Sequence, residues 1–89
     1  LEMSPEVIAS VPDCEGVLQL FDARKEVLQI SGTQTLRQAL LGQLAAGQAA
    51  YFLYEEDSMY TKRESELLQH YLSQHGRLPK GNDLSDDLF

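Results

Sequence analysis

The sequence predicts a small α+β domain, a three-stranded antiparallel sheet flanked by helices, in the order strand, strand, helix, strand, helix. Three observations predict it. Two apolar segments are joined by a short connection, two later segments carry apolar residues at helical spacing, and an apolar segment of strand-like composition lies between those two. A chain of 89 residues has room for a modest core, so we expect one domain over residues 3–82.

The first two strands are predicted by GVLQLFD (residues 16–22) and EVLQIS (residues 26–31), which are rich in Val, Leu, Ile and Phe. The intervening ARK has the length of a hairpin connection, so we expect the two strands to be antiparallel neighbours. Residues 3–15 are polar and contain Pro5 and Pro12, which is typical of an irregular lead-in with room for one helical turn.

The first long helix is predicted by Leu36, Leu40 and Leu44, which recur every four residues and form an apolar stripe that ends near Gly47. The segment AAYFLYEE (residues 49–56) follows. It is apolar on both of its alternating faces, which predicts a strand that is covered on both sides.

The second long helix is predicted to stop at Gly76, and its buried stripe is expected to consist of Leu67, Leu68, Tyr71 and Leu72. Both helices are preceded by a sequence with the form of a capping box, in which a Thr is followed three residues later by Glu or Gln. The two pairs are Thr35 with Gln38, and Thr61 with Glu64.

Both ends of the chain are expected to lie outside the domain. Leu1 and Glu2 precede Met3 and resemble a remnant of cloning, so Met3 is expected to be the native start. Residues 83–89, DLSDDLF, form an acidic tail without the periodic pattern of a helix or a strand.

The chain is acidic, with seven Lys and Arg residues against fourteen Asp and Glu residues and a formal net charge of −7. This charge opposes the attraction to phosphates that supplies most nucleic-acid affinity, so we expect no strong binding to duplex DNA at physiological salt. A local basic patch would allow DNA binding despite this net charge. The residues that could form such a patch are Arg24, Lys25, Lys62 and Arg63.

The sequence also carries signals about location. It contains no apolar run near 18 residues and no basic-then-apolar leader, and its single cysteine, Cys14, has no second cysteine for an internal disulfide. We therefore expect a cytoplasmic protein with no membrane partner.

No pattern typical of a metal site, a cofactor or a nucleophile stands out. His70 and His75 are five residues apart and so fall on different helix faces, and Cys14 has no neighbouring base. The lone glycine within residues 31–33 is more typical of a turn than of an anion site, and the acidic residues 55–57 are more typical of a solvated strand end than of a cation site. We expect no cofactor and no metal.

A family resemblance rests on three segments: Gly16-Val17, VLQISGTQTLRQAL (residues 27–40) and RESELLQHYLSQHGRLPKGN (residues 63–82). Together they resemble the GIY-YIG nuclease domain, especially the version in the endonuclease subunit of bacterial nucleotide-excision repair. That family carries Gly-(Ile/Val)-Tyr on its first strand, then Tyr-(Ile/Val)-Gly, a lysine and a helix rich in Leu and Arg. The likeness spans residues 11–82. The residues in matching places are Val27, Leu28, Ile30, Leu36, Arg37 and Leu40, and Pro79 and Asn82 keep the family's spacing.

The catalytic residues that this resemblance implies are replaced. The two strand tyrosines become Leu18 and Gln29, so no phenol is present there to take a proton from water or to orient it. The lysine becomes Gly32 and the helix arginine becomes Ala39, which removes stabilisation of transition-state charge. The metal-binding glutamate becomes Gln69, and an amide is a poor substitute for a carboxylate on Mg²⁺.

Two functions are consistent with this pattern. The leading hypothesis is a catalytically inactive GIY-YIG-like domain that acts as a binding or scaffold module for another protein. The alternative is an active or gated DNA endonuclease with an altered Mg²⁺ site around Glu66, Tyr60 and Arg37, since Glu66 lies about one helical turn from the family's metal position. The remaining explanation of the resemblance is that it is accidental, because small α+β domains of this layout are common.

The acidic tail predicts a mode of partner binding. It resembles the acidic, Phe-ended tip by which bacterial single-strand DNA-binding proteins recruit repair enzymes, although the proline before the last Phe is missing. The resemblance implies that Asp86 and Asp87 meet a basic rim on a partner while Leu88 and Phe89 fill an apolar pocket. The alternative is a solubilising tail whose Phe89 folds back onto the domain.

Overall fold

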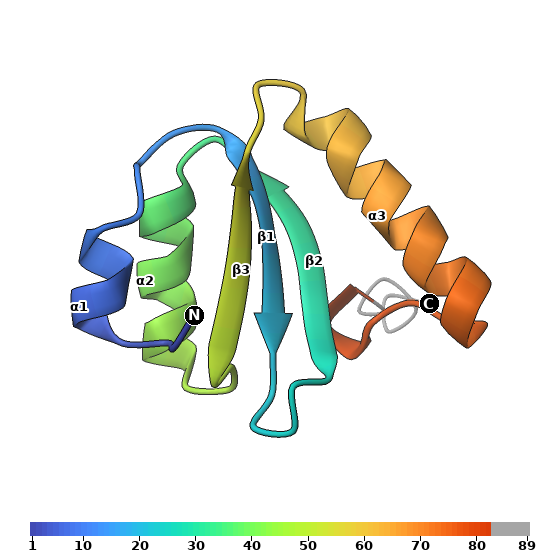
Figure 1. The fold of residues 1–89 in the computed structure, drawn as a ribbon, viewed down its shortest axis with the longest axis horizontal. Coiled ribbons are helices and arrows are strands. Elements are labelled where there is room, and N and C mark those ends of the chain that lie inside the picture. Colours follow the sequence, from blue (N-terminus) through green and yellow to red (C-terminus); the bar gives the residue numbers. More distant parts are fainter. Residues whose placement is uncertain (83–89) are drawn as a thin grey trace, which may run out of the picture.

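The computed structural model describes residues 1–82 as three layers, with a sheet between helices on both faces (Figure 1). Helices α1 (Pro5–Ala9) and α2 (Leu36–Ala46) lie on one face, and α3 (Tyr60–His75) lies on the other. A 3-10 turn, η1 (Lys80–Asn82), follows α3. The predicted α+β class, with its three-stranded antiparallel sheet, is confirmed.

The sheet has β1 (Gly16–Phe21) at its centre, paired antiparallel with β2 (Val27–Thr33) and with β3 (Tyr51–Glu56), in the order β2-β1-β3. The predicted hairpin joins β1 to β2. Asp22 shapes its turn, because one carboxylate oxygen accepts hydrogen bonds from the backbone N–H groups of Arg24 (2.8 Å) and Glu26 (3.0 Å).

The N-terminal residues continue the sheet beyond β3. Leu1 and Phe52 exchange two hydrogen bonds, of 3.0 Å and 2.8 Å, and the Met3 N–H donates to the Ala50 carbonyl at 3.0 Å. Glu2 thereby forms an antiparallel bridge opposite Tyr51. The origin of residues 1–2 as a cloning remnant stays a prediction. The lead-in contains one short helix, α1, which is the single helical turn that the sequence allowed for.

The core lies between the sheet and the α1–α2 layer. Strand alternation directs Leu18, Leu20 and Phe52 to the same face of the sheet, where they meet Leu36 and Leu40 of α2. All of these side chains are at most 2% exposed. The four-residue leucine spacing of the sequence therefore marks the packed face of α2.

Both long helices end at the glycines that the sequence predicts. Neither begins with the side-chain hydrogen bonds of the predicted capping boxes. Gly47 and Gly76 have left-handed φ angles of 74° and 71°, the conformation that stops a helix at low cost for glycine. Thr35 is the N-cap of α2, but its side chain makes no capping hydrogen bond. Helix α3 begins at Tyr60, so Thr61 lies inside it, and Glu64 turns to β2 instead.

Two predictions about burial are wrong, and both concern the face of the sheet that α3 covers. Strand β3 is an edge strand rather than one covered on both sides: Phe52 is buried, while Leu53 is 49% exposed. In α3 no residue is buried, and Leu72 of its predicted stripe is 39% exposed. Helix α3 packs mainly against β2 and β1, so it leaves much of the β3 side of this face open.

Two side chains close the outer edge of β2. The Asn82 amide accepts a hydrogen bond from the Ile30 N–H (2.8 Å) and donates one to the Ile30 carbonyl (2.7 Å), and a Glu64 carboxylate oxygen accepts from the Gly32 N–H at 2.6 Å. These contacts replace the pairing that another strand would provide. Within residues 1–82, no helix is long and apolar enough to cross a membrane.

Candidate binding surface

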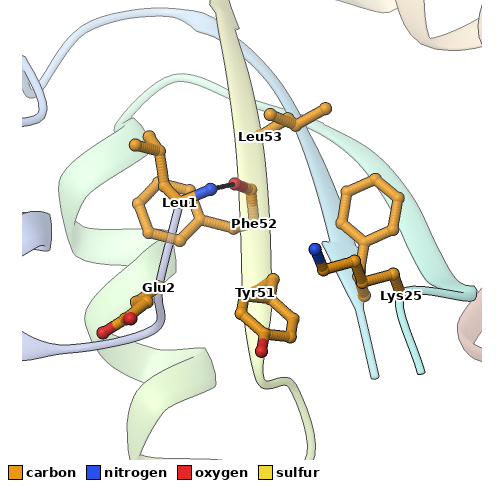
Figure 2. Close-up of a pocket in the computed structure, with 7 residues that line it drawn as sticks. Leu1, Glu2, Lys25, Tyr51, Phe52 and Leu53 are labelled. Carbon is orange, nitrogen blue, oxygen red and sulfur yellow. Dashed lines mark hydrogen bonds between the residues drawn. The ribbon is translucent and has the colours of Figure 1, made fainter. Parts of the chain in front are cut away.

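The open part of the sheet carries a small apolar surface, the β3 face, defined by Phe21, Lys25, Tyr51 and Leu53. Residues 51 and 53 alternate with the buried Phe52, so their side chains leave the sheet on the opposite side from the core (Figure 2). Phe21 pairs with Tyr51 across the β1–β3 ladder and so lies on the same face. A half-exposed leucine beside two aromatic residues is more apolar than an ordinary solvated strand face.

Lys25 holds the hairpin end of the β3 face in an unusual conformation. It is the non-glycine residue with a positive φ (65°) among residues 1–82, a conformation that costs about 1–2 kcal/mol for a residue with a Cβ. Its Nζ lies 5.5 Å from the centroid of the Tyr51 ring, within the range of a cation–π contact. The side chain therefore adds a cation to a surface that is otherwise apolar and aromatic.

The β3 face borders a cavity of about 420 Å³ that is open to solvent on one side. Its wall also includes Leu1 and Glu2, which pair with the edge of β3 (Figure 2). Leu1 is 54% exposed. Apolar walls with a few charged groups are the arrangement found where proteins accept an apolar side chain and fix its orientation through a charge.

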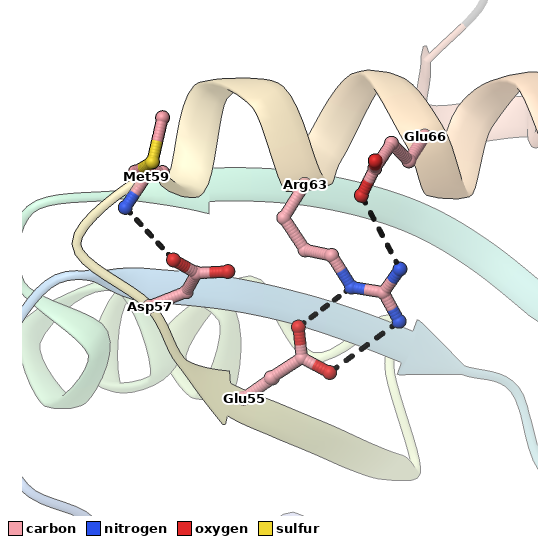
Figure 3. A network of polar contacts seen from close by, with 5 residues as sticks. All are labelled: Glu55, Asp57, Met59, Arg63 and Glu66. Carbon is pink, nitrogen blue, oxygen red and sulfur yellow. Dashed lines mark hydrogen bonds and ion pairs between the residues drawn. The ribbon is translucent and has the colours of Figure 1, made fainter.

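At the other end of β3, two of the acidic residues 55–57, Glu55 and Asp57, are each engaged by a neighbour (Figure 3). The Arg63 guanidinium donates to both oxygens of Glu55, at 2.7 Å and 3.5 Å, and lies 3.5 Å from a Glu66 oxygen. This pairing raises the pKa of Arg63 above its usual value, first through the hydrogen bond to Glu55. Asp57 accepts from the Met59 N–H at 2.8 Å. These exposed contacts order the loop into α3 and contribute little to stability.

Comparison with protein families gives one match. Residues 1–74 match the model of a domain of unknown function, DUF7508. The chain belongs to this family. No curated protein matches the chain. The DUF7508 description names no activity or ligand, so the resemblance to GIY-YIG nucleases stays a prediction.

In this DUF7508 domain the positions assigned to lost catalytic residues lie on both faces of the sheet. Leu18 is 1% exposed in the core, Ala39 packs against the same core, and Gln29 is a half-buried residue of β2 on that face. Gly32 faces the first turn of α3 instead, and Gln69 is an exposed residue of α3. The structure thus brings Leu18 and Ala39 into one layer and separates them from Gln69. The assignment of these positions as a degenerate site stays a prediction.

The residues of the endonuclease alternative are also separated. Arg37 is an exposed residue of α2, on the opposite side of the sheet from Tyr60 and Glu66 of α3. The Glu66 carboxylate is 53% exposed and paired with Arg63. Among residues 1–82, no group of three or more His, Cys, Asp or Glu side chains is arranged to hold a metal ion.

The basic residues singled out in the sequence form no single patch. Arg24 and Lys25 lie in the hairpin at one end of the sheet, whereas Lys62 and Arg63 lie in the first turns of α3 at the other end. The Gly32 N–H, the candidate anion contact in residues 31–33, already binds the Glu64 carboxylate. The predicted partner-binding residues Asp86, Asp87, Leu88 and Phe89 lie outside the described residues.

The β3 face was not identified from the sequence. The segment at residues 49–56 carried the signal, because it is apolar on both faces, but we interpreted that pattern as burial on both sides. The contribution of Lys25 depends on its positive φ and on its contact with Tyr51, which are properties of the folded hairpin.

Proposed function

We propose that this DUF7508 domain is a catalytically inactive, GIY-YIG-like binding or scaffold module of the cytoplasm, and that it holds another protein at the β3 face. The observation that carries the proposal is the exposure of Leu53, at 49%, beside Tyr51 and Phe21 on an edge strand that α3 leaves uncovered. Exposed apolar groups that are contiguous and accompanied by a charge are typical of interaction sites.

The chemistry of the β3 face describes the partner. Tyr51 and Leu53 offer apolar area, and Lys25 offers a cation at the hairpin end. The complementary surface is one that presents aliphatic or aromatic side chains together with a carboxylate near Lys25. The net charge of −7 disfavours self-association, so the proposed partner is a different protein.

The test compares two leucines of nearly equal exposure. Leu53 is 49% exposed on β3, and Leu41 is 46% exposed on α2, on the other side of the sheet. The unchanged chain and the two variants Leu53→Gln and Leu41→Gln are immobilised in parallel, and the proteins that each captures are identified. The affinity of each for the purified partner is then measured. Leu53→Gln should weaken binding by about tenfold, the equivalent of about 1.4 kcal/mol for an apolar group left unburied. Equal affinity of the two variants would exclude the β3 face.

The endonuclease alternative has its own assay. The full chain is incubated with supercoiled, branched and single-stranded DNA in Mg²⁺ or Mn²⁺, beside Glu66→Ala. The proposal predicts no cleavage above the buffer control for either protein. Cleavage by the unchanged chain that disappears in Glu66→Ala would replace the proposal with an altered nuclease.

Binding to duplex DNA is expected to be absent at about 150 mM salt, because the net charge of −7 repels phosphates and the two pairs of basic residues lie apart. A gel shift tests this expectation. Saturable micromolar binding that is lost in a Lys62→Glu/Arg63→Glu double variant would contradict it.

A further inference from the structure

The two edges of the sheet are closed to different extents. On β2, the side chains of Asn82 and Glu64 bind the outward-pointing backbone groups of the strand. On β3, residues 1–3 pair with the first half of the strand only, and the pair nearest its middle joins Leu1 to Phe52 (Figure 2). The second half of β3, residues 53–56, is the open β3 edge.

The backbone of the open β3 edge presents hydrogen-bonding groups on its outer side. The N–H and C=O groups of Phe52 both bind Leu1 on that side, at 2.8 Å and 3.0 Å. The Asp57 N–H points the opposite way and donates to the residue before β1 at 3.1 Å. Because the direction of these groups alternates along a strand, those of Tyr54 and Glu56 point outward, as those of Phe52 do. Among residues 1–82 they have no partner on that side.

Residues 1–3 show what the edge of β3 accepts. They run antiparallel to the strand, with hydrogen bonds of 2.8 Å and 3.0 Å and a bridge between Glu2 and Tyr51. An added strand on the same line would pair with residues 53–56. Backbone hydrogen bonds supply affinity in this mode of recognition, and the side chains that lie across from the edge decide which segment binds.

The β3 face sets the first side-chain requirement. Leu53 is 49% exposed and belongs to that face. In an antiparallel pair, the residue directly opposite places its side chain on the same face, with the two Cβ atoms about 4.5–5.5 Å apart. An apolar residue opposite Leu53 would therefore bury the exposed part of this leucine.

Carboxylates set the second requirement. Glu56 is exposed at the end of β3, where its Oε1 accepts a hydrogen bond from the Cys14 Sγ at 3.5 Å. The pKa of the Cys14 thiol is raised first by partial burial, then by Glu56, and further by Asp13 and Glu15. Three carboxylates therefore act on the same thiol at this end of the sheet.

The cations near this end do not cancel its charge. Lys62 and Arg63 lie in the first turns of α3, and Arg63 is shared between Glu55 and Glu66. Charged side chains on an exposed edge discourage pairing between identical strands. A second copy would bring the same carboxylates together, so the open β3 edge favours a basic segment from a different protein.

We propose that the open β3 edge takes up a strand from the partner, an extended segment antiparallel to β3 with basic residues opposite Glu56 and Glu55 and an apolar residue opposite Leu53. The inference rests on the proposed partner site, because the added strand would border the β3 face. It names the mode of binding and the kind of segment that the partner contributes. The backbone of this segment binds the outward groups of Tyr54 and Glu56.

The test titrates a probe peptide into the full chain and follows backbone amide NMR spectra. The probe is an acetylated and amidated peptide of the order Lys-Lys-Thr-Val, which places its lysines opposite Glu56 and Glu55 and its valine opposite Leu53. We predict saturable shifts centred on residues 53–56, with a Kd of up to about 1 mM for this isolated strand. A lack of saturable shifts, or shifts centred elsewhere, would overturn the proposal. So would shifts of these amides when the chain alone is diluted, because those would place a second copy on the edge.

Backbone methylation of the probe separates strand pairing from attraction between charges. Methyl groups on the backbone nitrogens of the first lysine and the threonine remove the N–H groups that face β3, and should weaken binding by about tenfold or more. The matched control carries methyl groups on the second lysine and the valine, whose N–H groups point away, and should bind like the unmodified probe. Equal affinity of the two methylated peptides would overturn strand addition.

A pair of substitutions in the chain tests the same hydrogen bonds. Glu56→Pro removes an outward N–H, at a strand position where proline is tolerated, whereas Glu56→Gln removes the charge alone. Glu56→Pro should weaken probe binding about fivefold beyond Glu56→Gln, the effect of one hydrogen bond. Equal affinity of two folded variants would overturn the proposal, and the methylated probes decide the outcome if Glu56→Pro does not fold.

The failure of this proposal is distinguishable from the failure of the proposed function. If Leu53→Gln weakens binding of the purified partner while the two methylated probes bind equally, the partner uses the β3 face without adding a strand. If the methylated probes differ as predicted while Leu53→Gln leaves partner binding unchanged, the edge accepts a strand and the β3 face is not the partner site.

Discussion

We predict that the side chain of Asn82, which lies outside the core, stabilises the domain through its hydrogen bonds to β2. Its amide makes two hydrogen bonds to the half-buried backbone of Ile30, at 2.8 Å and 2.7 Å, and thereby closes the edge of β2. Each such bond contributes about 0.5–1.5 kcal/mol net, so Asn82→Ala should lower the free energy of unfolding by about 1–3 kcal/mol. For a domain of this size, each kcal/mol lowers Tm by about 4–8 °C.

Thermal and urea unfolding followed by circular dichroism measure this loss, and hydrogen exchange of the Ile30 amide reports on the bond itself. Gln48→Ala, at an exposed loop position, is the control and should change stability by less than about 0.5 kcal/mol. The reasoning is refuted if Asn82→Ala matches that control and the Ile30 amide remains as protected as before.

Three further predictions concern single residues. Lys25→Gly should leave the free energy of unfolding in urea unchanged or raise it slightly, because relief of the positive φ (about 1–2 kcal/mol) offsets the entropy cost of glycine (about 0.5–1 kcal/mol). The same substitution should weaken partner capture. A clear loss of stability would show that the strained residue is structural. Gly32→Ala should lower the free energy of unfolding by about 1–3 kcal/mol in the same assay, because the new Cβ would lie 2.7 Å from the Tyr60 ring and 3.2 Å from the Tyr60 carbonyl oxygen. An unchanged urea midpoint would contradict this contact. Partial burial, the hydrogen bond to Glu56 and nearby acids raise the pKa of the Cys14 thiol, so less thiolate is present at a given pH. The pH midpoint of its alkylation should therefore lie above that of free cysteine and fall in Glu56→Gln, and an identical midpoint in that variant would refute the role of the carboxylate.

The elements were predictable where one local signal decided the outcome. Leucine spacing at Leu36 and Leu40 gave the packed face of α2, and the left-handed glycines Gly47 and Gly76 ended both helices where the sequence predicted. The capping boxes were less informative. Glu64 had a stronger partner in the Gly32 N–H, which belongs to another element and so leaves no trace in the local sequence.

The candidate site was not predictable, because it depends on which strand lies at the edge of the sheet. Phe52 and Leu53 look alike in the sequence, yet one is completely buried and the other is half exposed. The difference arises because α3 packs mainly against β2 and β1 and leaves Leu53 half exposed. Pairing of Leu1 with β3, and the contact of Lys25 with Tyr51, are likewise products of tertiary structure.

Site-specific photo-cross-linking in the native host tests the β3 face most directly. A benzophenone-bearing residue is placed at position 53 in one sample and at position 41 in the other, two leucine positions that are 49% and 46% exposed. The account predicts one discrete cross-linked protein at Leu53 that is missing at Leu41, and loss of that product when Tyr51→Ser is added. Identical cross-linking patterns at the two positions would contradict the claim that the β3 face binds a partner.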